Sequence, residues 1–396
     1  MHAVTTRRSD IVDASNPGVY HCVSRCVRRE SLIDDPERRE WIVARLDFLT
    51  RFMAIDVISF AVMRNHIHLL LAIRPEIVGC WSDREVAERR MAVLPRKRKR
   101  GRNSVTPAGD QYAIELAAVL ASPKCLANAR RDLSNLGFFH RLLKEPCARI
   151  WNKADGVTGH FWEGRFKSPR VLDVEGLIQV ANYIELNEVH ACAAVSIPSS
   201  LWTSASTQWR RLCLALQESL GTVDMDTTSM VLRLRQIPWD PVFPCRTTPH
   251  EPAREELDEA NAAPPQLRSV CAALGRDCFT PSLVEYLEVM HHTGARARPD
   301  KRGCILVDEP PPMESAMFAM LHAVAPAMNI DSSAAAAHFG ERLTAAIAAL
   351  ITVSHRDFGY ACMRGTCYGS AESIRREAAR RGCRWLWTGL VPPMAA

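Results

Sequence analysis

The sequence lacks the long apolar runs and repeats that would place it in several protein classes. No run of about 18 apolar residues occurs in its 396 residues, so no transmembrane helix is expected. The first 15 residues have no apolar core after Arg7 and Arg8, so no secretory signal is expected. Both absences favour a cytoplasmic protein. Ordinary apolar and charged fractions, 47% and 24%, exclude a disordered chain, a collagen-like chain and a coiled-coil rod.

Cysteine pairs at metal-binding spacing are also missing. The chain has 14 cysteines, but no Cys-x-x-Cys occurs among them. This excludes a zinc ribbon and a thioredoxin-like redox motif. Without a secretory signal, the scattered cysteines are expected to be reduced and mostly buried thiols.

Positive charge is concentrated in the first half of the chain. The net charge of +6 arises there, because residues 1–200 carry 30 Lys and Arg against 23 Asp and Glu. The second half is nearly balanced, with 20 basic against 21 acidic residues. A polyanionic partner is therefore more probable for the first half than for the second.

Strands and helices alternate along the first half. Residues 19–25, 55–63, 66–73 and 169–172 have the composition of strands. Helices are predicted to begin at Asp35-Pro36, near Leu133 and after Asp173, the last running to about Val189. The order β-α-β-β-α-β-α predicts an α+β fold, with a ferredoxin-like antiparallel sheet and helices on one face.

The chain divides into three predicted parts. The first is a domain over residues 1–220 with an insertion at about 79–131. A Pro-rich and acidic linker follows over 221–266. Residues 267–396 form a mainly helical accessory region, to which the sequence assigns no role. Apolar segments at 317–325 and 334–353, and a basic helix over 370–387, belong to this region.

Two histidines alternate on the strand predicted at 66–73. Side chains two residues apart on a strand share a face and lie about 7 Å apart. His66 and His68 therefore project together, while Ile67 and Leu69 point into a helix layer. Two imidazoles at this spacing can bind one divalent ion. Two surface histidines on a strand are the structural alternative, since a bare His-x-His is common.

A tyrosine and an asparagine lie four residues apart on the helix after the last strand. Tyr183 and Asn187 share a face of that helix, while Ile184 can pack on the sheet. Taken alone, they fit an ordinary half-buried tyrosine and an asparagine near a helix end.

Two further segments combine features suited to nucleic acid. Residues 161–168 interleave aromatic side chains with Arg165 and Lys167, which can hold phosphates while the rings stack on bases. A packed aromatic turn with solvated cations is the alternative. Residues 95–102 are a polar basic run that includes Lys97 and Arg98, predicted to form a mobile, solvated, phosphate-binding loop.

Together these motifs resemble the single-tyrosine HUH transposases, most closely the REP-associated tyrosine transposases. The matched segments occur in the family's order over residues 17–203. They are Tyr20–Arg25, Arg28-Arg29, Asp34-Asp35, Asn65–Leu70, Gly159–Ser168 and Tyr183–Asn187. The insertion and the second half lie outside the resemblance. The sequence also departs from the family at Glu188, where proline is usual, and at His190, where arginine is usual.

The resemblance implies a metal-dependent reaction on single-stranded DNA. Tyr183 would be the nucleophile, and His66, His68 and Asn187 would bind Mg²⁺ or Mn²⁺. Cleavage would join the tyrosine to a 5′-phosphate and leave a 3′-hydroxyl. The absence of a second tyrosine beside Tyr183 disfavours the two-tyrosine relaxases and replication initiators.

The resemblance also implies hairpin-bearing DNA as the partner and a monomer or homodimer as the active form. The residues expected to contact DNA are basic, and they are Arg25, Arg28, Arg165, Lys167, Lys97 and Arg98. Two other functional classes stay open. One is a domesticated protein that binds DNA hairpins without cleaving them. The other is a metal-dependent hydrolase in which water, not Tyr183, is the nucleophile.

Overall fold

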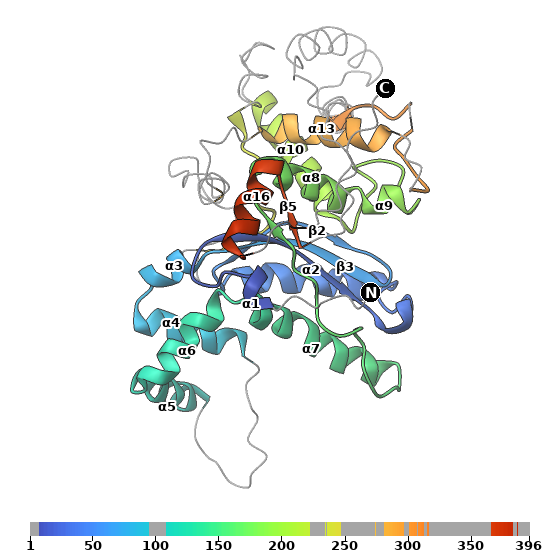
Figure 1. The fold of residues 1–396 in the computed structure, drawn as a ribbon. Coiled ribbons are helices and arrows are strands. Elements are labelled where there is room, and N and C mark those ends of the chain that lie inside the picture. The colour runs from blue at the N-terminus through green and yellow to red at the C-terminus, as the bar shows by residue number, and fades with distance from the viewer. Residues whose placement is uncertain are drawn as a thin grey trace. The chain divides into compact units, whose positions relative to one another are not determined.

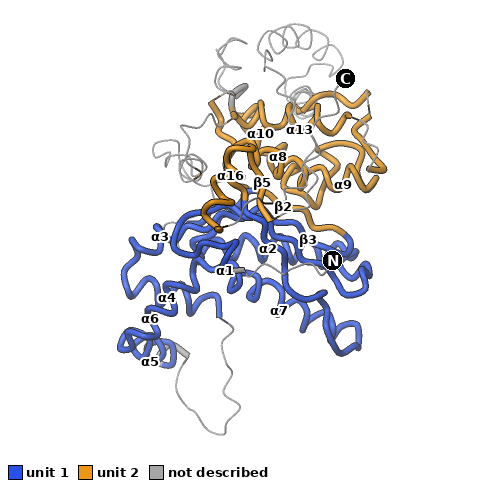
Figure 2. The backbone as a smooth tube through the Cα atoms, viewed as in Figure 1, with its two compact units in different colours: residues 1–58, 64–170, 243–263 blue, residues 59–63, 171–242, 264–396 orange. Residues whose placement is uncertain are grey.

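The computed structural model describes most of the first half of the chain and selected segments of the second. The described residues are 8–94, 108–221, 234, 236–246, 274, 281–296, 301–306, 308–312, 315–316, 366–382 and 386. They fall into two compact units (Figure 2): unit 1 contains residues 1–58, 64–170 and 243–263, and unit 2 contains 59–63, 171–242 and 264–396. No helix in these described ranges is long and apolar enough to cross a bilayer.

Unit 1 contains two full strands and most of the first-half helices. Their bounds are α1 Arg8–Ile11, β1 Gly18–Arg25, the 3₁₀ turn η1 Val27–Arg29, α2 Pro36–Thr50, β3 His66–Ile73, α3 Pro75–Cys80, α4 Asp83–Val93, α5 Ala108–Leu120, α6 Pro123–Leu133 and α7 Leu136–Ala154. Strands β2 (Ile55–Val62) and β4 (Arg170–Val171) each have residues in both units.

Unit 2 draws its elements from distant parts of the sequence. They are α8 Val174–Glu185, α9 Asn187–His190, α10 Ser204–Gly221, α13 Leu283–Ala295, β5 Cys367–Tyr368 and α16 Ala371–Arg380. Helix α13 contacts both α8 and α10, and β5 contacts α8. Segments from the second half of the chain therefore pack directly on the helix that carries Tyr183. The predicted division at residues 221–266 differs from the division between the two units.

Among the described residues, a five-stranded sheet has the order β2-β3-β1-β4-β5. Strands β1 and β3 pair antiparallel, from Gly18 opposite Ile73 to Arg25 opposite His66. The strands expected at 19–25, 55–63 and 66–73 are present within a residue of their predicted bounds, and the fold is a mixture of helix and sheet.

Helices α2 and α7 lie along one face of β1 and β3 in unit 1 (Figure 1). Helix α2 begins as predicted, because the Asp35 side chain accepts a hydrogen bond from the Glu37 backbone N–H at 2.8 Å and Pro36 occupies the first turn. Trp41 of α2 meets Trp151 of α7 edge to face, with ring centroids 5.7 Å apart. This contact packs α2 against α7.

The predicted insertion at 79–131 contains α4, α5 and α6. Arg90 of α4 binds Asp132 of α6 through Nη2 at 3.0 Å, and Arg130 binds Asp83 at 2.7 Å. These helices pack on one another. The basic run 95–102, with Lys97 and Arg98, lies outside the described residues, as do the apolar segments predicted at 317–325 and 334–353.

One expectation about a helix needs correction. The single helix predicted from 174 to about 189 is broken at Leu186, where α8 ends and α9 begins. Within the predicted linker, residues 236–246 contain a fully buried Trp239. Its ring stacks on Tyr286 of α13 in unit 2, with centroids 3.8 Å apart. Trp239 and Tyr286 are more than 40 residues apart in the sequence, so no local periodicity predicts their contact.

A buried ion pair in unit 1 links the start of β2 to the end of β3. Asp56 is fully buried, and its Oδ2 accepts from Arg74 Nη1 at 3.1 Å. Its Oδ1 accepts from the Cys245 backbone N–H at 2.7 Å. Burial raises the pKa of Asp56, against the lowering effect of Arg74. Removing the arginine would leave a buried carboxyl group without its charge partner.

We therefore expect Arg74→Met to lower the free energy of unfolding by about 3–5 kcal/mol, measured by urea titration. Arg84→Met is the matched control, because Arg84 makes an exposed ion pair with Glu88. That change is expected to cost under about 1 kcal/mol. Equal losses in the two variants would contradict this account of the buried pair.

Candidate functional site

The sheet face that carries His66 and His68 is built by β1 and β3 of unit 1. The two rings lie edge to face, with centroids 4.8 Å apart. His66 is directly opposite Arg25, and His68 is directly opposite Val23. Directly opposite residues of an antiparallel pair project to the same side. Arg25, predicted to contact phosphate, therefore shares the histidine face. Ile67 and Leu69 are buried on the other face, as predicted.

His21 of β1 completes this cluster, although the sequence analysis assigned it no role. Its Nε2 lies 2.9 Å from His68 Nδ1, and the two rings stack with centroids 5.2 Å apart. Burial lowers the pKa of His21 to about 3, so its ring is neutral at physiological pH. A neutral His21 can accept a hydrogen bond from His68 Nδ1–H and fix the tautomer and orientation of that ring.

His66 has a comparable partner on its Nδ1 side. Asn65 Oδ1 lies 2.7 Å from His66 Nδ1. The Nδ1 atoms of both histidines thus have hydrogen-bond partners, and the Nε2 atoms are the ones suited to ligate a metal ion. Across the described ranges, no group of three or more His, Cys, Asp or Glu side chains has a metal-binding arrangement. A metal at this pair would need another kind of ligand.

Lys167 of unit 1, also predicted to contact DNA, lies on the same face. Lys167 bridges to Val23 by two backbone hydrogen bonds of 3.0 Å, so it projects with the histidines. The Lys167 and Arg165 side chains are exposed, and between them Phe166 is buried and stacks on His140. Successive side chains of residues 165–167 thus alternate between solvent and the interior, so the aromatic ring is packed and the two cations are solvated.

Arg28 and Arg29, in the turn after β1, adopt left-handed backbone conformations with φ values of 53° and 60°. Such conformations are unfavourable for residues other than glycine. Arg28 is exposed, and its contact with Glu30 at 3.8 Å is a solvated pair. Its guanidinium is thus accessible to a phosphate, as the resemblance implies.

Tyr183 lies in the last turn of α8 in unit 2, and Asn187 begins α9. Asn187 Nδ2 donates to the backbone oxygens of Tyr183 at 2.8 Å and of Ile184 at 3.1 Å. This side-chain amide competes with the helix ladder, which explains the break at Leu186. The contact keeps Asn187 beside the turn that carries Tyr183, and its Oδ1 is the atom able to ligate a metal. The Tyr183 side chain is half-buried.

The start of α8 is held by a segment near the C-terminus. Asp173 caps the helix by accepting from the Gly176 N–H at 2.8 Å, and its second oxygen accepts from the Ser370 N–H at 2.7 Å. Burial acts to raise the pKa of Asp173. The hydrogen bonds act in the opposite direction and outweigh burial, so the pKa lies below its usual value. The carboxylate thus stays charged and joins α8 to the start of α16.

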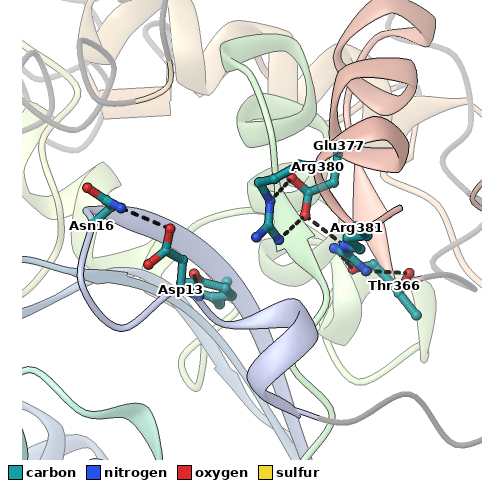
Figure 3. Close-up of polar contacts among 7 residues, drawn as sticks. Asp13, Asn16, Thr366, Glu377, Arg380 and Arg381 are labelled. Atoms are coloured by element: carbon teal, nitrogen blue, oxygen red, sulfur yellow. Dashed lines mark hydrogen bonds and ion pairs between the residues drawn. The ribbon is translucent and has the colours of Figure 1, made fainter. Parts of the chain in front are cut away.

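Helix α16 lies within the basic helix predicted over residues 370–387. Figure 3 shows Glu377 between Arg380 and Arg381, with Arg381 also bonded to Thr366. The Glu377 side chain is only 5% exposed. Much of the positive charge of α16 is therefore neutralised within unit 2.

In unit 1, the same figure shows Asn16 bonded to Asp13 before β1.

The end of α8 is held by a buried carboxyl group, Glu185. Tyr286 of α13 donates to Glu185 Oε2 at 2.5 Å, and Ser204 at the start of α10 bonds to Oε1. Burial raises the pKa of Glu185 to about 7, although both hydrogen bonds oppose that shift. Burial also raises the pKa of Tyr286 well above its usual value. Glu185 therefore ties α8 to two neighbouring helices.

Comparisons with known proteins give one distant likeness. No protein-family model matches the chain, and no curated protein matches it. Among solved structures, the chain is similar to a REP-associated tyrosine transposase bound to a REP hairpin. The identity is 11%, the match covers 53% of this chain and 87% of that chain, and the TM-score is 0.31. A TM-score this low does not establish a shared fold.

Glu185 predicts a distinctive pH dependence of stability. Its pKa is about 7 folded and 4.5 in the ordinary state, so the folded state binds the proton more tightly. Protonated Glu185 contributes about 3 kcal/mol to the free energy of unfolding. This contribution is complete below pH 4.5 and is lost as the pH rises through 7. Glu185→Gln should remove this loss, measured as the free energy of unfolding in urea at pH 5 and pH 8. Exposed Glu175→Gln should retain the wild-type slope, and an unchanged slope in Glu185→Gln would contradict the assignment.

Proposed function

We propose that this protein is a metal-dependent single-stranded DNA endonuclease and strand-transferase, of the REP-associated tyrosine transposase kind. It acts on hairpin-bearing DNA through a 5′-phosphotyrosine intermediate, as a monomer or homodimer. The observation that carries the proposal is the histidine pair on β3. His66 and His68 share one face, and each Nδ1 has a partner that would aim its Nε2 at a metal ion.

The topology supports a ferredoxin-like domain of the HUH type. Four strands follow the order β2-β3-β1-β4, with β1 and β3 antiparallel at the centre. Helix α2 connects β1 to β2, and α7 precedes β4. This order of elements supports the proposed β-α-β-β-α-β connectivity, in which α3 to α6 would be an addition between β3 and α7.

The residues present fit a divalent metal ion. The imidazoles of His66 and His68 and the Oδ1 atom of Asn187 would hold Mg²⁺ or Mn²⁺, and open positions would remain for phosphate oxygens. When bound, the ion supplies positive charge to the scissile phosphate and orients it for in-line attack. The reaction requires His66 and His68 of unit 1 and Tyr183 of unit 2 to act on one phosphate.

Tyr183 performs the bond exchange. Its Oη forms a bond to phosphorus as the bond from phosphorus to the 3′-oxygen breaks. The departing oxygen keeps the electron pair and takes up a proton, while the phenolic proton passes to solvent. The phosphotyrosine ester retains the energy of the original phosphodiester. A 3′-hydroxyl can then attack that phosphorus and release Tyr183, so joining requires no ATP.

The exposed cations of unit 1 suit the DNA backbone. Half-buried Arg25 and exposed Lys167 project from the histidine face, and Arg28 and Arg165 are exposed. Such contacts hold a strand in register without reading its sequence. We propose that Lys97 and Arg98 add phosphate contacts. Phosphate contacts of this kind make binding weaken as salt rises.

A second candidate function is hairpin binding without cleavage. In the described parts of the chain, no set of three His, Cys, Asp or Glu residues could hold a metal, and Asn187 uses its amide nitrogen inside α8. A descendant that kept the fold and basic face alone would have these features. It predicts hairpin binding that is unaffected by Tyr183→Phe.

The test is a denaturing gel of protein mixed with labelled hairpin-bearing single strands. With Mg²⁺ or Mn²⁺, wild type should give a detergent-resistant protein–DNA adduct. Tyr183→Phe, His66→Ala and His68→Ala should each reduce it by at least about 100-fold, since each removes a group that acts only in the reaction. EDTA should abolish it.

Controls separate the alternatives. Exposed Arg84→Met is expected to give wild-type adduct, because Arg84 lies on α4 and pairs with Glu88. Native binding with no adduct, across a broad hairpin panel, would favour the non-catalytic protein. Cleaved strands without attached protein, unaffected by Tyr183→Phe, would favour a hydrolase.

His21 gives a prediction about the metal site. His21→Leu removes the acceptor at His68 Nδ1, so Mn²⁺ affinity should fall by about 10–100-fold, measured by titration of the metal into protein. His21→Gln should retain most of the affinity, because its side-chain oxygen can accept the same proton. Equal affinities for wild type and His21→Leu would contradict the orienting role of His21.

A further inference from the structure

A short segment from the second half of the chain lies against the end of α8 and α9 in unit 2. The backbone N–H groups of Arg302 and Gly303 both donate to the His190 oxygen at 3.3 Å. Further on, the Ile305 N–H donates to the Gly294 oxygen at 2.8 Å. Residues 301–305, here called the 301–305 segment, are thus hydrogen-bonded at one end to α9 and at the other to α13.

Two glycines make this contact close. A Cβ atom at Gly303 would overlap the Val189 carbonyl oxygen and lie 2.9 Å from Cys192 Sγ. A Cβ at Gly294 would lie 2.7 Å from Ile305 Cδ1 and 2.8 Å from Leu186 Cδ2. Backbone and side chains therefore approach within distances that only glycine allows. The register of the 301–305 segment on α9 and α13 is fixed by this fit.

The segment places a lysine against the tyrosine ring. Lys301 Nζ lies 4.9 Å from the centroid of the Tyr183 ring. This is within the distance at which an ammonium group is attracted to an aromatic face. The Lys301 side chain is half-buried, so solvent screens its charge less than that of a free surface lysine. Lys301 lies almost 100 residues beyond the region that carries the family resemblance.

We propose that Lys301 is a positioning residue for the DNA reaction: it holds the Tyr183 ring in its attacking orientation and supplies a fixed positive charge beside the forming bond. The inference rests on the proposed function of Tyr183. It gives the 301–305 segment, and with it part of the second half of the chain, a role in the reaction.

The chemistry requires no proton transfer by the lysine. As the bond from Tyr183 Oη to phosphorus forms and the 3′-oxygen departs, negative charge is spread over the phosphate oxygens and both bridging oxygens. Lys301 stays an ammonium ion throughout. A charge already held in place stabilises that distribution more than a mobile cation, because it needs no reorganisation at the moment of reaction.

The experiment compares three variants under single turnover at saturating hairpin DNA, with Mn²⁺. Lys301→Gln should slow adduct formation by about 10-fold or more, whereas its Kd for the same DNA, by fluorescence anisotropy, should change by less than about 3-fold. Lys301→Arg should restore most of the rate. Arg302→Gln is the matched control, because Arg302 is the adjacent exposed cation, and it should react like wild type.

A second measurement tests the contact without DNA or metal. Protein labelled with 3-fluorotyrosine has six tyrosines, and Tyr183→Phe identifies the fluorine signal of Tyr183. Lys301→Gln should shift that signal, and Arg302→Gln should leave it in place. The same spectra show whether each variant is folded.

The outcomes distinguish this inference from the proposed function. Wild-type rate in Lys301→Gln, or equal losses in Lys301→Gln and Arg302→Gln, would overturn the role of Lys301 and leave the transesterase intact. A Tyr183 fluorine signal that is unaffected by Lys301→Gln would overturn the contact itself. If wild type forms no adduct, the proposed function fails, and the catalytic role of Lys301 fails with it.

Discussion

Two carboxyl groups determine how α8 is held, and the placement of Tyr183 depends on them. Asp173 caps the start of the helix and also binds the Ser370 N–H, so the first turn is joined to α16. Glu185 ends the helix and binds Tyr286 of α13 and Ser204 of α10. Both groups are buried, where hydrogen bonds to a carboxyl group are stronger than in water. Tyr183 lies two residues before the second of these anchors.

The second half of the chain is thus part of the support for the candidate nucleophile. Three of its segments reach α8 or α9 inside unit 2: α13, the 301–305 segment, and β5 with the start of α16. The departures from the family pattern lie in the same place. Glu188 is buried and accepts from the Trp202 N–H at 3.2 Å, and the His190 oxygen accepts from the 301–305 segment. At His190, therefore, a position that differs from the family contacts a segment that the family resemblance does not cover.

The local sequence pattern predicted the helices and strands of unit 1 well. It did not predict the contacts between segments that are far apart in the sequence. Alternation along 66–73 gave the shared face of His66 and His68, and Asp35-Pro36 gave the start of α2, because each depends on neighbours in sequence. The role of His21 was not predicted because it depends on the register between β1 and β3, which the sequence pattern did not supply. The break at Leu186 depends on one amide, Asn187, that bonds back to the helix. The Lys301–Tyr183 and Trp239–Tyr286 contacts join segments far apart in sequence, and no local periodicity encodes them.

The central claim is that Tyr183 itself becomes linked to DNA, and the most direct test is to identify the linked residue. Protein incubated with Mn²⁺ and a hairpin-bearing single strand would be digested with protease and nuclease, and the peptides analysed by mass spectrometry. The account predicts a nucleotide attached through a 5′-phosphate to the peptide that contains Tyr183, absent when EDTA is present. A nucleotide attached to any other residue, or cleaved DNA with every peptide unmodified, would contradict it.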